Sequence, residues 1–264
     1  MKIGFIGCGN MAGAMLSGIL DAGKYQATDI IGADVYAPSA EATKEKFGIV
    51  VTTDNKEVLR QAEVIVLSIK PQFCEEVIKE IRSEVREGQL FITIIPGKTL
   101  AWLEDKFEQK VKLVRTMPNT PAIVKEGMTG ACANEAVTQA DMERAIDILS
   151  GFGRVEIVAE NLLDVVTGVS GSSPAYVFMF IEAMADAAVA GGMPRDKAYT
   201  FAAQAVMGSA KLLLESGKHP GELKDMVCSP GGTTIGAVRV LEDKGLRSAV
   251  FEAVTEATRI ARQL

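Results

Sequence analysis

The sequence predicts an α/β protein, with an N-terminal Rossmann-type doubly wound sheet followed by an all-helical C-terminal domain. Up to about residue 160, short apolar runs alternate with amphipathic stretches, which is the pattern of a parallel sheet with helices on both faces. Past Asn161 the strand signals stop, and alanine- and methionine-rich helical stretches take over. We therefore divide the chain into domains at residues 1–160 and 161–264.

The expected strands are short runs rich in β-branched residues and bounded by Gly, Pro or Asn, as buried parallel strands usually are. They lie at residues 3–6, 29–34, 49–51, 64–68, 90–94, 111–116, 129–133 and 154–158. Helical stretches fall between them, for example at residues 10–22, 40–47, 72–85 and 137–149.

The C-terminal domain is expected to be helical throughout, and several helices begin near a proline, where the missing N–H costs nothing. One stretch, Ala175–Gly192, is apolar nearly all round, so it should be buried on most sides. Glu182 and Asp186 interrupt it on one helical face, which argues against a membrane span. In so small a domain, the missing cover is expected to come from another subunit. The helices are expected at residues 162–169, 174–190, 194–215, 220–227, 231–243 and 246–263.

The composition argues against several classes of function. With 264 residues, a net charge of −6 and no basic run, the chain gives no indication of nucleic-acid binding. The four cysteines, Cys8, Cys74, Cys132 and Cys228, form no CxxC pair, which fits a reducing cytoplasm better than disulfides or a zinc site. Cys228 fits a buried small residue better than a reactive thiol. The chain enters a strand at once, so we expect no signal peptide, and a cytoplasmic location.

The turn after the first strand has the pattern G-x-G-x-x-A, from Gly7 to Ala12. Gly7 permits a tight turn, Gly9 lets the backbone approach a pyrophosphate, and Ala12 allows the helix to pack closely on the strand. Because the turn follows an apolar strand and opens a helix, whose free N–H groups favour anions, we predict a dinucleotide site. A purely structural glycine turn is the alternative.

The second strand ends at Asp34, where an acid commonly accepts hydrogen bonds from the adenosine ribose. An acid there repels a 2′-phosphate and so favours NADH, whereas Lys44 and Lys46 are close enough in sequence to bend towards a phosphate. The coenzyme is therefore NADPH or NADH. As an alternative, Asp34 is a solvated turn residue before Pro38.

Two further loops follow strands and should lie at the same edge of the sheet. Ser68-Ile69-Lys70-Pro71 follows the fourth strand, and Lys70 fits a ribose or substrate contact and a solvated lysine equally well. Thr116 to Pro121 follows the sixth strand, and its two prolines in four residues stiffen it. A stiff loop suits holding an amide ring in place, although a structural corner is the alternative.

The segment Ser229-Pro-Gly-Gly-Thr-Thr-Ile235 places two glycines and two hydroxyls at the mouth of a helix. Such a mouth presents unpaired N–H groups and the positive end of a helix dipole, so it can hold a carboxylate. We expect the N–H groups of Gly231, Gly232 and Thr233 to bind the carboxylate. The carbon of an imine becomes electrophilic once its nitrogen is hydrogen-bonded, and a hydroxyl can provide that bond. We therefore expect Thr234 to hydrogen-bond the nitrogen of an imine substrate. Capping of helices by Ser229 and Thr233 is the alternative.

A second cluster of small residues, Gly168 to Tyr176, leads into the apolar helix, and we expect it to serve packing rather than ligand binding.

The single histidine, His219, precedes Pro220 between two helices and fits a helix-end residue better than a catalytic base. A hydroxy-acid dehydrogenase would need a histidine or lysine as proton carrier, and Lys211 and Lys224 are the candidates.

Together these segments resemble pyrroline-5-carboxylate reductase, the last enzyme of proline synthesis, over essentially the whole chain. The resemblance rests on the motifs Phe5 to Met11, Ile69 to Gln72, Arg115 to Pro121, Gly168 to Tyr176, and His219-Pro220 with Ser229 to Ile235. The resemblance implies hydride transfer from the nicotinamide C4 of NADPH or NADH to the imine carbon of 1-pyrroline-5-carboxylate. It implies dimers formed by the helical domains, often assembled into decamers, and a cyclic imino acid rather than a nucleic acid or a membrane as partner.

The resemblance also assigns residues. Thr234 matches the threonine that hydrogen-bonds the ring nitrogen, and the substrate-binding residues are Ser229, Gly231, Gly232, Thr233 and Thr234. From the resemblance and the turn chemistry together, the coenzyme-binding residues are Ile6, Gly7, Gly9, Asn10, Met11, Asp34, Asn55, Ser68, Ile69, Lys70, Pro71 and Asn119.

Two departures from the family pattern stand out. Ser173 replaces the second glycine of the usual Gly-Ser-Gly-Pro-Ala, which should tighten a turn without touching the chemistry. Asp34-Val35-Tyr36 lacks the usual residues that grip a 2′-phosphate, which weakens the expectation of NADPH. A non-catalytic nucleotide sensor is a further alternative, distinguished by coenzyme binding without turnover.

Overall fold

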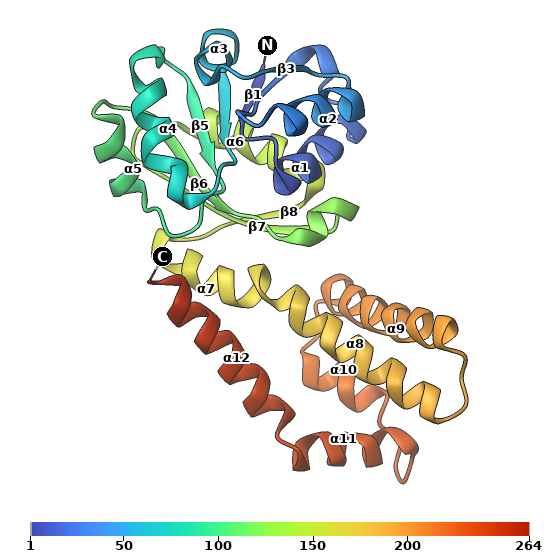
Figure 1. Cartoon of the computed structure of the whole chain (residues 1–264). Helices are drawn as coiled ribbons and strands as arrows, with labels where there is room; N and C mark the ends of the chain where they lie inside the picture. Colours follow the sequence, from blue (N-terminus) through green and yellow to red (C-terminus); the bar gives the residue numbers. More distant parts are fainter. Residues whose placement is uncertain (1, 264) are drawn as a thin grey trace. The chain divides into compact units, whose positions relative to one another are not determined.

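The computed structural model describes residues 2–263, and its N-terminal part is built on one eight-stranded sheet (Figure 1). Every strand lies within two residues of an expected one, and most strands are short β-branched runs with clear borders. The strands are β1 (Ile3–Ile6), β2 (Ile30–Ala33), β3 (Val50–Thr52), β4 (Val64–Leu67), β5 (Leu90–Thr93), β6 (Lys112–Met117), β7 (Gly127–Ala133) and β8 (Gly153–Ile157).

The strand order is β3-β2-β1-β4-β5-β6-β7-β8, so the winding reverses between β1 and β4. The first six strands are parallel to their neighbours, which brings their carboxyl ends to one edge, and the predicted doubly wound sheet is confirmed. β7 departs from this pattern, because it pairs antiparallel with β6 and parallel with β8. The apolar pattern of a strand does not encode its direction. The direction of β7 is therefore set by tertiary contacts.

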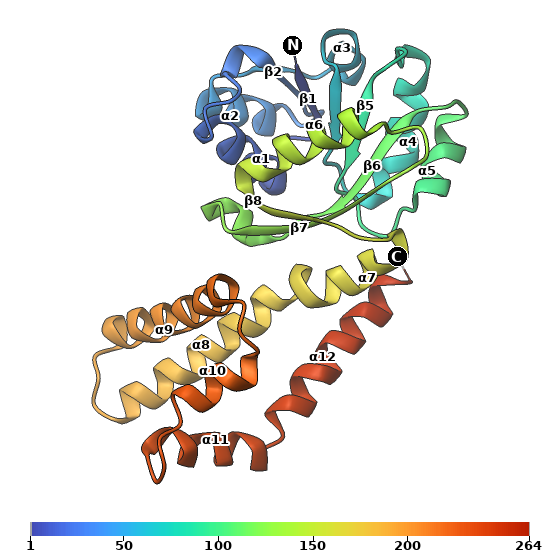
Figure 2. The ribbon, with the colours of Figure 1, turned by 180° about the vertical axis from the view of Figure 1, so that it is seen from behind.

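Helices cover both faces of the sheet (Figures 1 and 2). Alternate residues of the central strands enter two separate cores, so that Ile3 and Phe5 face one and Ile6 faces the other. The first core is completed mainly by α1 (Asn10–Asp21) and α6 (Gln139–Leu149), with α2 (Ala37–Phe47) contributing Phe47. The second is completed by α3 (Asn55–Gln61), α4 (Cys74–Ile81) and α5 (Leu100–Phe107).

Two features of these helices were not anticipated. The expected helix at 72–85 is three pieces, with 3₁₀ turns at Pro71–Phe73 and Arg82–Glu84 on either side of α4. No sequence pattern singled out α3 and α5, because they are only 7 and 8 residues long and mix charged with apolar residues.

The C-terminal helices follow the expected ranges closely. The helix expected at 162–169 is α7 (Leu163–Val166), which continues into a π-helical turn at Thr167–Gly171, called the π-turn below. The remaining helices are α8 (Ser173–Ala190), α9 (Arg195–Ser216), α10 (Pro220–Met226), α11 (Thr233–Asp243) and α12 (Leu246–Ala261).

The chain forms two compact units, which we describe separately. The sheet unit comprises Met1–Ser172 and Glu256–Leu264, and the helical unit comprises Ser173–Thr255. The sheet unit thus extends past the boundary expected near residue 160, since α7 and the π-turn pack with the sheet through Leu163 and Val166.

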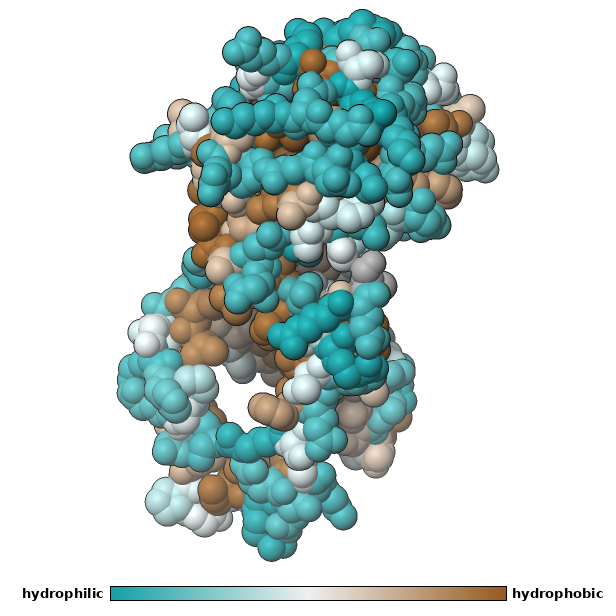
Figure 3. Space-filling model, turned by 90° about the vertical axis from the view of Figure 1, so that its left-hand side faces the viewer, coloured by the Kyte–Doolittle hydropathy of each residue, from teal (hydrophilic) through white to brown (hydrophobic). Residues whose placement is uncertain are grey.

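The helical unit leaves much apolar surface uncovered. Within α8 only Ala185 is buried, while Phe178 and Met179 are 65% and 69% exposed although α8 packs along α9. Figure 3 shows apolar residues in brown reaching the surface among hydrophilic ones in its lower part. One helical run, Glu160–Ala190, is long and apolar enough to cross a membrane by length and composition alone, and 6% of its most apolar window is buried.

Candidate active site

The glycine turn follows β1 at the edge where the parallel strands end. Gly7 has φ +90°, and a Cβ there would lie 2.7 Å from the Ser68 carbonyl oxygen, so only glycine fits. The Ser68 hydroxyl donates a hydrogen bond of 2.6 Å to the Gly7 carbonyl. These contacts fix the turn against the end of β4, at the point where the winding of the sheet reverses.

Gly9 is a glycine for another reason. It is the N-cap of α1, no side chain caps that helix, and a Cβ on Gly9 would meet no atom within 4 Å. Gly9 and Asn10 border a groove of about 490 Å³ that continues to Ser39 and Lys46. An open approach to uncapped N–H groups at a helix N-terminus fits the pyrophosphate of a dinucleotide.

Asp34 is tied into the glycine turn. One carboxylate oxygen accepts hydrogen bonds from the Cys8 N–H and the Ser39 hydroxyl, both at 3.0 Å, and the other accepts one from the Tyr36 N–H at 2.9 Å. The carboxylate is therefore a fixed acceptor beside the turn rather than a solvated turn residue. Ser39, which no sequence motif singled out, completes this arrangement.

The remaining expected coenzyme residues lie in or near the glycine turn and the loop after β4. Ile6, Ser68 and Ile69 adjoin the glycine turn, although the Ile6 side chain is only 1% exposed and only its backbone is available. Lys70 is exposed, and it is the N-cap residue of the 3₁₀ turn that begins at Pro71. Met11 is half-buried in the first turn of α1.

The side chains of Asn55 and Asn119, which are both expected to contact the coenzyme, hydrogen-bond to other parts of the protein. The Asn55 amide, 3% exposed, donates to the Glu80 carboxylate at 2.9 Å. The Asn119 amide, 8% exposed, donates to the Ser170 carbonyl at 3.0 Å and accepts from the Met128 N–H at 2.8 Å. Both side chains make structural hydrogen bonds, which sequence motifs do not reveal.

The segment Ser229–Gly232 is a tight turn that opens α11. The Gly232 N–H donates to the Ser229 carbonyl at 3.0 Å, and Pro230 and Gly231, with φ +69°, occupy the central positions, as a type II turn requires. A Cβ on Gly232 would overlap the Ser229 hydroxyl, so a larger residue here would force the Ser229 side chain to move. The sequence therefore dictates the shape of the turn.

The first turn of α11 is left without a cap. Gly232 is its N-cap residue and no side chain bonds to its N–H groups, so the alternative that Ser229 and Thr233 act as caps is wrong for α11. The expectation for Gly232 also needs correction, because its N–H is used inside the turn. Thr234 is half-buried, and across residues 2–263 its hydroxyl has no hydrogen-bond partner.

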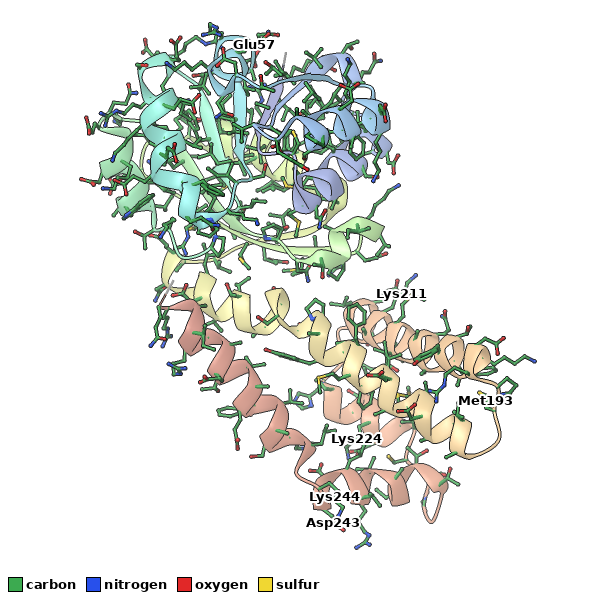
Figure 4. The ribbon with its side chains drawn as sticks, viewed as in Figure 1. Glu57, Met193, Lys211, Lys224, Asp243 and Lys244 are labelled. Atoms are coloured by element: carbon green, nitrogen blue, oxygen red, sulfur yellow. The ribbon has the colours of Figure 1, made fainter. Side chains whose placement is uncertain are left out.

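The two lysines considered as proton carriers of a hydroxy-acid dehydrogenase, Lys211 and Lys224, are labelled in Figure 4, and each forms an ion pair. His219 is the N-cap of α10, where its Nδ1 accepts the Gly221 N–H at 3.1 Å, as expected for a helix-end residue. Lys211 pairs with Glu215 at 3.6 Å. Lys224 pairs with Asp225 at 2.7 Å, and that carboxylate raises the pKa of Lys224, which makes it a poorer base.

The cysteines are free thiols. Burial raises the pKa of Cys8 to about 12 and that of Cys74 and Cys132 to about 11, so these three are unreactive at neutral pH. Cys228 is half-buried beside the Ser229–Gly232 turn. Among residues 2–263, no group of three or more His, Cys, Asp or Glu side chains is placed to hold a metal ion.

Comparison with known proteins decides the family. Residues 160–264 match the family described as pyrroline-5-carboxylate reductase dimerisation, and residues 2–97 match NADP oxidoreductase, coenzyme F420-dependent. A pyrroline-5-carboxylate reductase of Escherichia coli (strain K12) is 52% identical over 97% of this chain and 95% of the relative. The chain belongs to the pyrroline-5-carboxylate reductase family. It is an oxidoreductase with a Rossmann-type sheet and the dimerisation domain of that family, as the sequence predicted.

Solved structures of the family match the whole chain. The pyrroline-5-carboxylate reductase of Coxiella burnetii has a TM-score of 0.92 and 34% identity, covering 99% of this chain and 97% of the other. The Plasmodium falciparum enzyme, solved with NADP bound, has a TM-score of 0.89 and 30% identity, covering 100% and 97%. The predicted division into a sheet and helices is thus the architecture of this family.

Proposed function

We propose that the protein reduces 1-pyrroline-5-carboxylate to L-proline with NADPH or NADH, the last step of proline biosynthesis. The observation that carries the proposal is the uncapped N-terminus of α11, with the unpartnered Thr234 hydroxyl in its first turn. The N–H groups of Gly231 and Thr233 bind the substrate carboxylate, and Ser229 shapes the turn that presents them. The substrate is an anion, and the net charge of −6 makes such a local site necessary.

In this proposal Thr234 is the catalytic residue. A C=N carbon becomes electrophilic when its nitrogen is protonated or hydrogen-bonded, so a neutral hydroxyl suffices where a carbonyl substrate would need a stronger acid. Thr234 donates a hydrogen bond to the ring nitrogen and fixes the orientation of the imine carbon.

The glycine turn holds the coenzyme. The N–H groups of Asn10 and Met11 would hold the pyrophosphate, for which Gly9 leaves room, and the Asp34 carboxylate would accept hydrogen bonds from the adenosine ribose hydroxyls. When bound, the coenzyme supplies the hydride from nicotinamide C4. The backbone of Ser68 to Pro71, Asn55 and Asn119 lines the same edge of the sheet in this proposal.

In this proposal the protein is an oligomer and lies in the cytoplasm. The exposed apolar residues of α8, which include Phe178 and Met179, contact a second copy of the chain rather than a membrane, since residues 160–264 match a dimerisation family. Dimers, or decamers built from them, act on a small imino acid and not on nucleic acid. The functional division is proposed at residue 160, where the dimerisation match begins.

Purified protein tests the activity directly. With pyrroline-5-carboxylate, the reduced coenzyme should be consumed and proline formed, and the ratio of kcat/KM for NADPH and NADH should identify the preferred coenzyme. No turnover with either coenzyme, together with tight coenzyme binding, would instead support a nucleotide sensor. Oxidation of small hydroxy acids by NAD⁺ or NADP⁺ would support a hydroxy-acid dehydrogenase.

A further inference from the structure

A break in the helix that leads out of the sheet unit is built into the sequence. The π-turn at Thr167–Gly171 closes with a hydrogen bond of 2.8 Å from the Ser172 N–H to the Thr167 carbonyl, five residues back. In an unbroken α-helix the Ser170 carbonyl would accept from the backbone N–H at position 174. That position is Pro174, which has no N–H. The helix therefore cannot satisfy the Ser170 carbonyl in α-helical register.

Asn119 supplies the missing donor. Its amide nitrogen donates to the Ser170 carbonyl at 3.0 Å, and its amide oxygen accepts the Met128 N–H at 2.8 Å. The side chain is 8% exposed, so both bonds are sheltered from water. A second contact lies beside it, because a Cβ on Gly171 would come within 3.0 Å of the Met117 methyl group.

These contacts join the π-turn to the loop at the coenzyme edge. Met117 ends β6, which is parallel to β5 and β4, so its carboxyl end lies on the edge that carries Gly7 and Ser68. Helices with a π-helical turn often carry it at functional sites, since the extra residue redirects the helix. The helical unit begins directly after the π-turn, at Ser173.

We propose that Asn119 is a positioning residue, which fixes the direction of the chain at the π-turn relative to the loop after β6. This role rests on the proposed reduction, because the π-turn is the last part of the sheet unit before the segment that carries the proposed catalytic residue Thr234. Asn119 then affects the hydride step without contributing to coenzyme affinity. A direct coenzyme contact by Asn119 would instead contribute to coenzyme affinity, so the two roles can be separated by measurement.

The variant N119D removes the donor to Ser170 and places a carboxylate oxygen against that carbonyl. The new carboxylate still accepts the Met128 N–H but has no donor for the Ser170 carbonyl. Coenzyme Kd should remain within experimental error of wild type, while kcat falls about tenfold or more because the reacting atoms are misplaced. The primary isotope effect with coenzyme deuterated at C4 should rise as hydride transfer becomes rate-limiting. The matched control N161D makes the same change at an exposed asparagine nine residues before Ser170 and should leave all three values unchanged.

Each other outcome overturns the proposal. A weaker coenzyme Kd with unchanged kcat would make Asn119 a coenzyme contact. Unchanged values of both Kd and kcat would show that the bond to Ser170 has no part in the reaction. If N119D fails to fold, N119D/P174A restores a backbone N–H for the Ser170 carbonyl. Recovered stability with low kcat then supports the positioning role, and recovery of both shows that Asn119 only satisfies a carbonyl. Absence of turnover in the wild type would refute the proposed function itself, and with it this role.

Discussion

Gly7 and Gly9 stand two residues apart in one turn, yet each is glycine for a different physical reason. At Gly7 the backbone is left-handed and the protein leaves no room for a Cβ, since Ser68 and Ile69 approach it. At Gly9 the backbone is extended, with φ −72°, and the space beside it is open. Thus stability demands the first glycine, and the ligand demands the second.

The variants G7A and G9A should separate these two demands. G9A fills only the open approach, so we expect an unchanged Tm and a coenzyme Kd weaker by about tenfold or more through loss of contacts to the pyrophosphate. G7A should lower Tm as well, because strain at positive φ costs about 1–2 kcal/mol before any clash with Ser68. Thermal unfolding and coenzyme titration measure the two effects. Equal loss of Tm in both variants would contradict the interpretation of Gly9.

Thr234 is the residue on which the proposed chemistry depends. We expect T234A to lower kcat by about 10- to 100-fold, as for loss of one positioned polar group, and T234S to retain most of the activity. The control T200A removes a hydroxyl of α9 that donates to the Asp196 carbonyl of the same helix, and should leave kcat unchanged. Steady-state rates with saturating coenzyme decide the matter. A T234A enzyme as fast as wild type would remove this hydroxyl from the mechanism.

At the scale of elements, α6 shows how local sequence fixes the start of a helix. Thr138 accepts the Asp141 N–H, and Asp141 accepts the Thr138 N–H, which makes a reciprocal cap. Asp141 also pairs with Lys112 of β6 at 2.8 Å, which ties the helix to the sheet that it covers. Burial acts to raise the pKa of Asp141, but the bonds from Lys112 and Thr138 outweigh it and lower the pKa below its usual value.

The variant D141N should be less stable at neutral pH by about 1 kcal/mol, the typical value of an N-terminal cap. Because the folded-state pKa is lowered, this stabilisation is complete above the unfolded pKa and is lost as the pH falls through the folded value. The difference in Tm between wild type and D141N should therefore shrink below about pH 4. The control D105N alters a carboxylate that is 74% exposed and should show no such trend. A difference that stays constant with pH would contradict this account.

Elements with a strong local signal were predictable, and those set by tertiary contacts were not. The glycine turn, the borders of β1 and β4, and the turn before α11 follow from Gly, Pro and β-branched residues alone. The antiparallel direction of β7 does not, because it depends on how the loop after β6 turns, and neither does the bond from Asn119 to the Ser170 carbonyl, which lies 51 residues away in the sequence. The π-turn begins inside the helix expected at residues 162–169 and continues past its end, and Pro174 is the sequence signal for it.

At the scale of the whole molecule, the two units bury their apolar residues to very different degrees. The sheet unit has two closed cores, one on each face of the sheet. In the helical unit, by contrast, Phe178, Phe201 and Phe251 are 65%, 66% and 73% exposed. Such an apolar surface is more than a soluble monomer usually carries, and it marks a surface that another chain covers.

Phe178 on α8 therefore offers a test of the oligomer. We expect F178D to shift the protein from dimers or larger assemblies towards single chains, because a carboxylate at a subunit contact is buried without a partner. The control V124D places the same charge at a residue of the sheet unit that is 68% exposed, and should leave the assembled mass unchanged. Light scattering across a range of protein concentrations measures both. A wild-type protein with the mass of one chain would show that the apolar surface of α8 serves something other than self-association, and then the match to a dimerisation family would need another explanation.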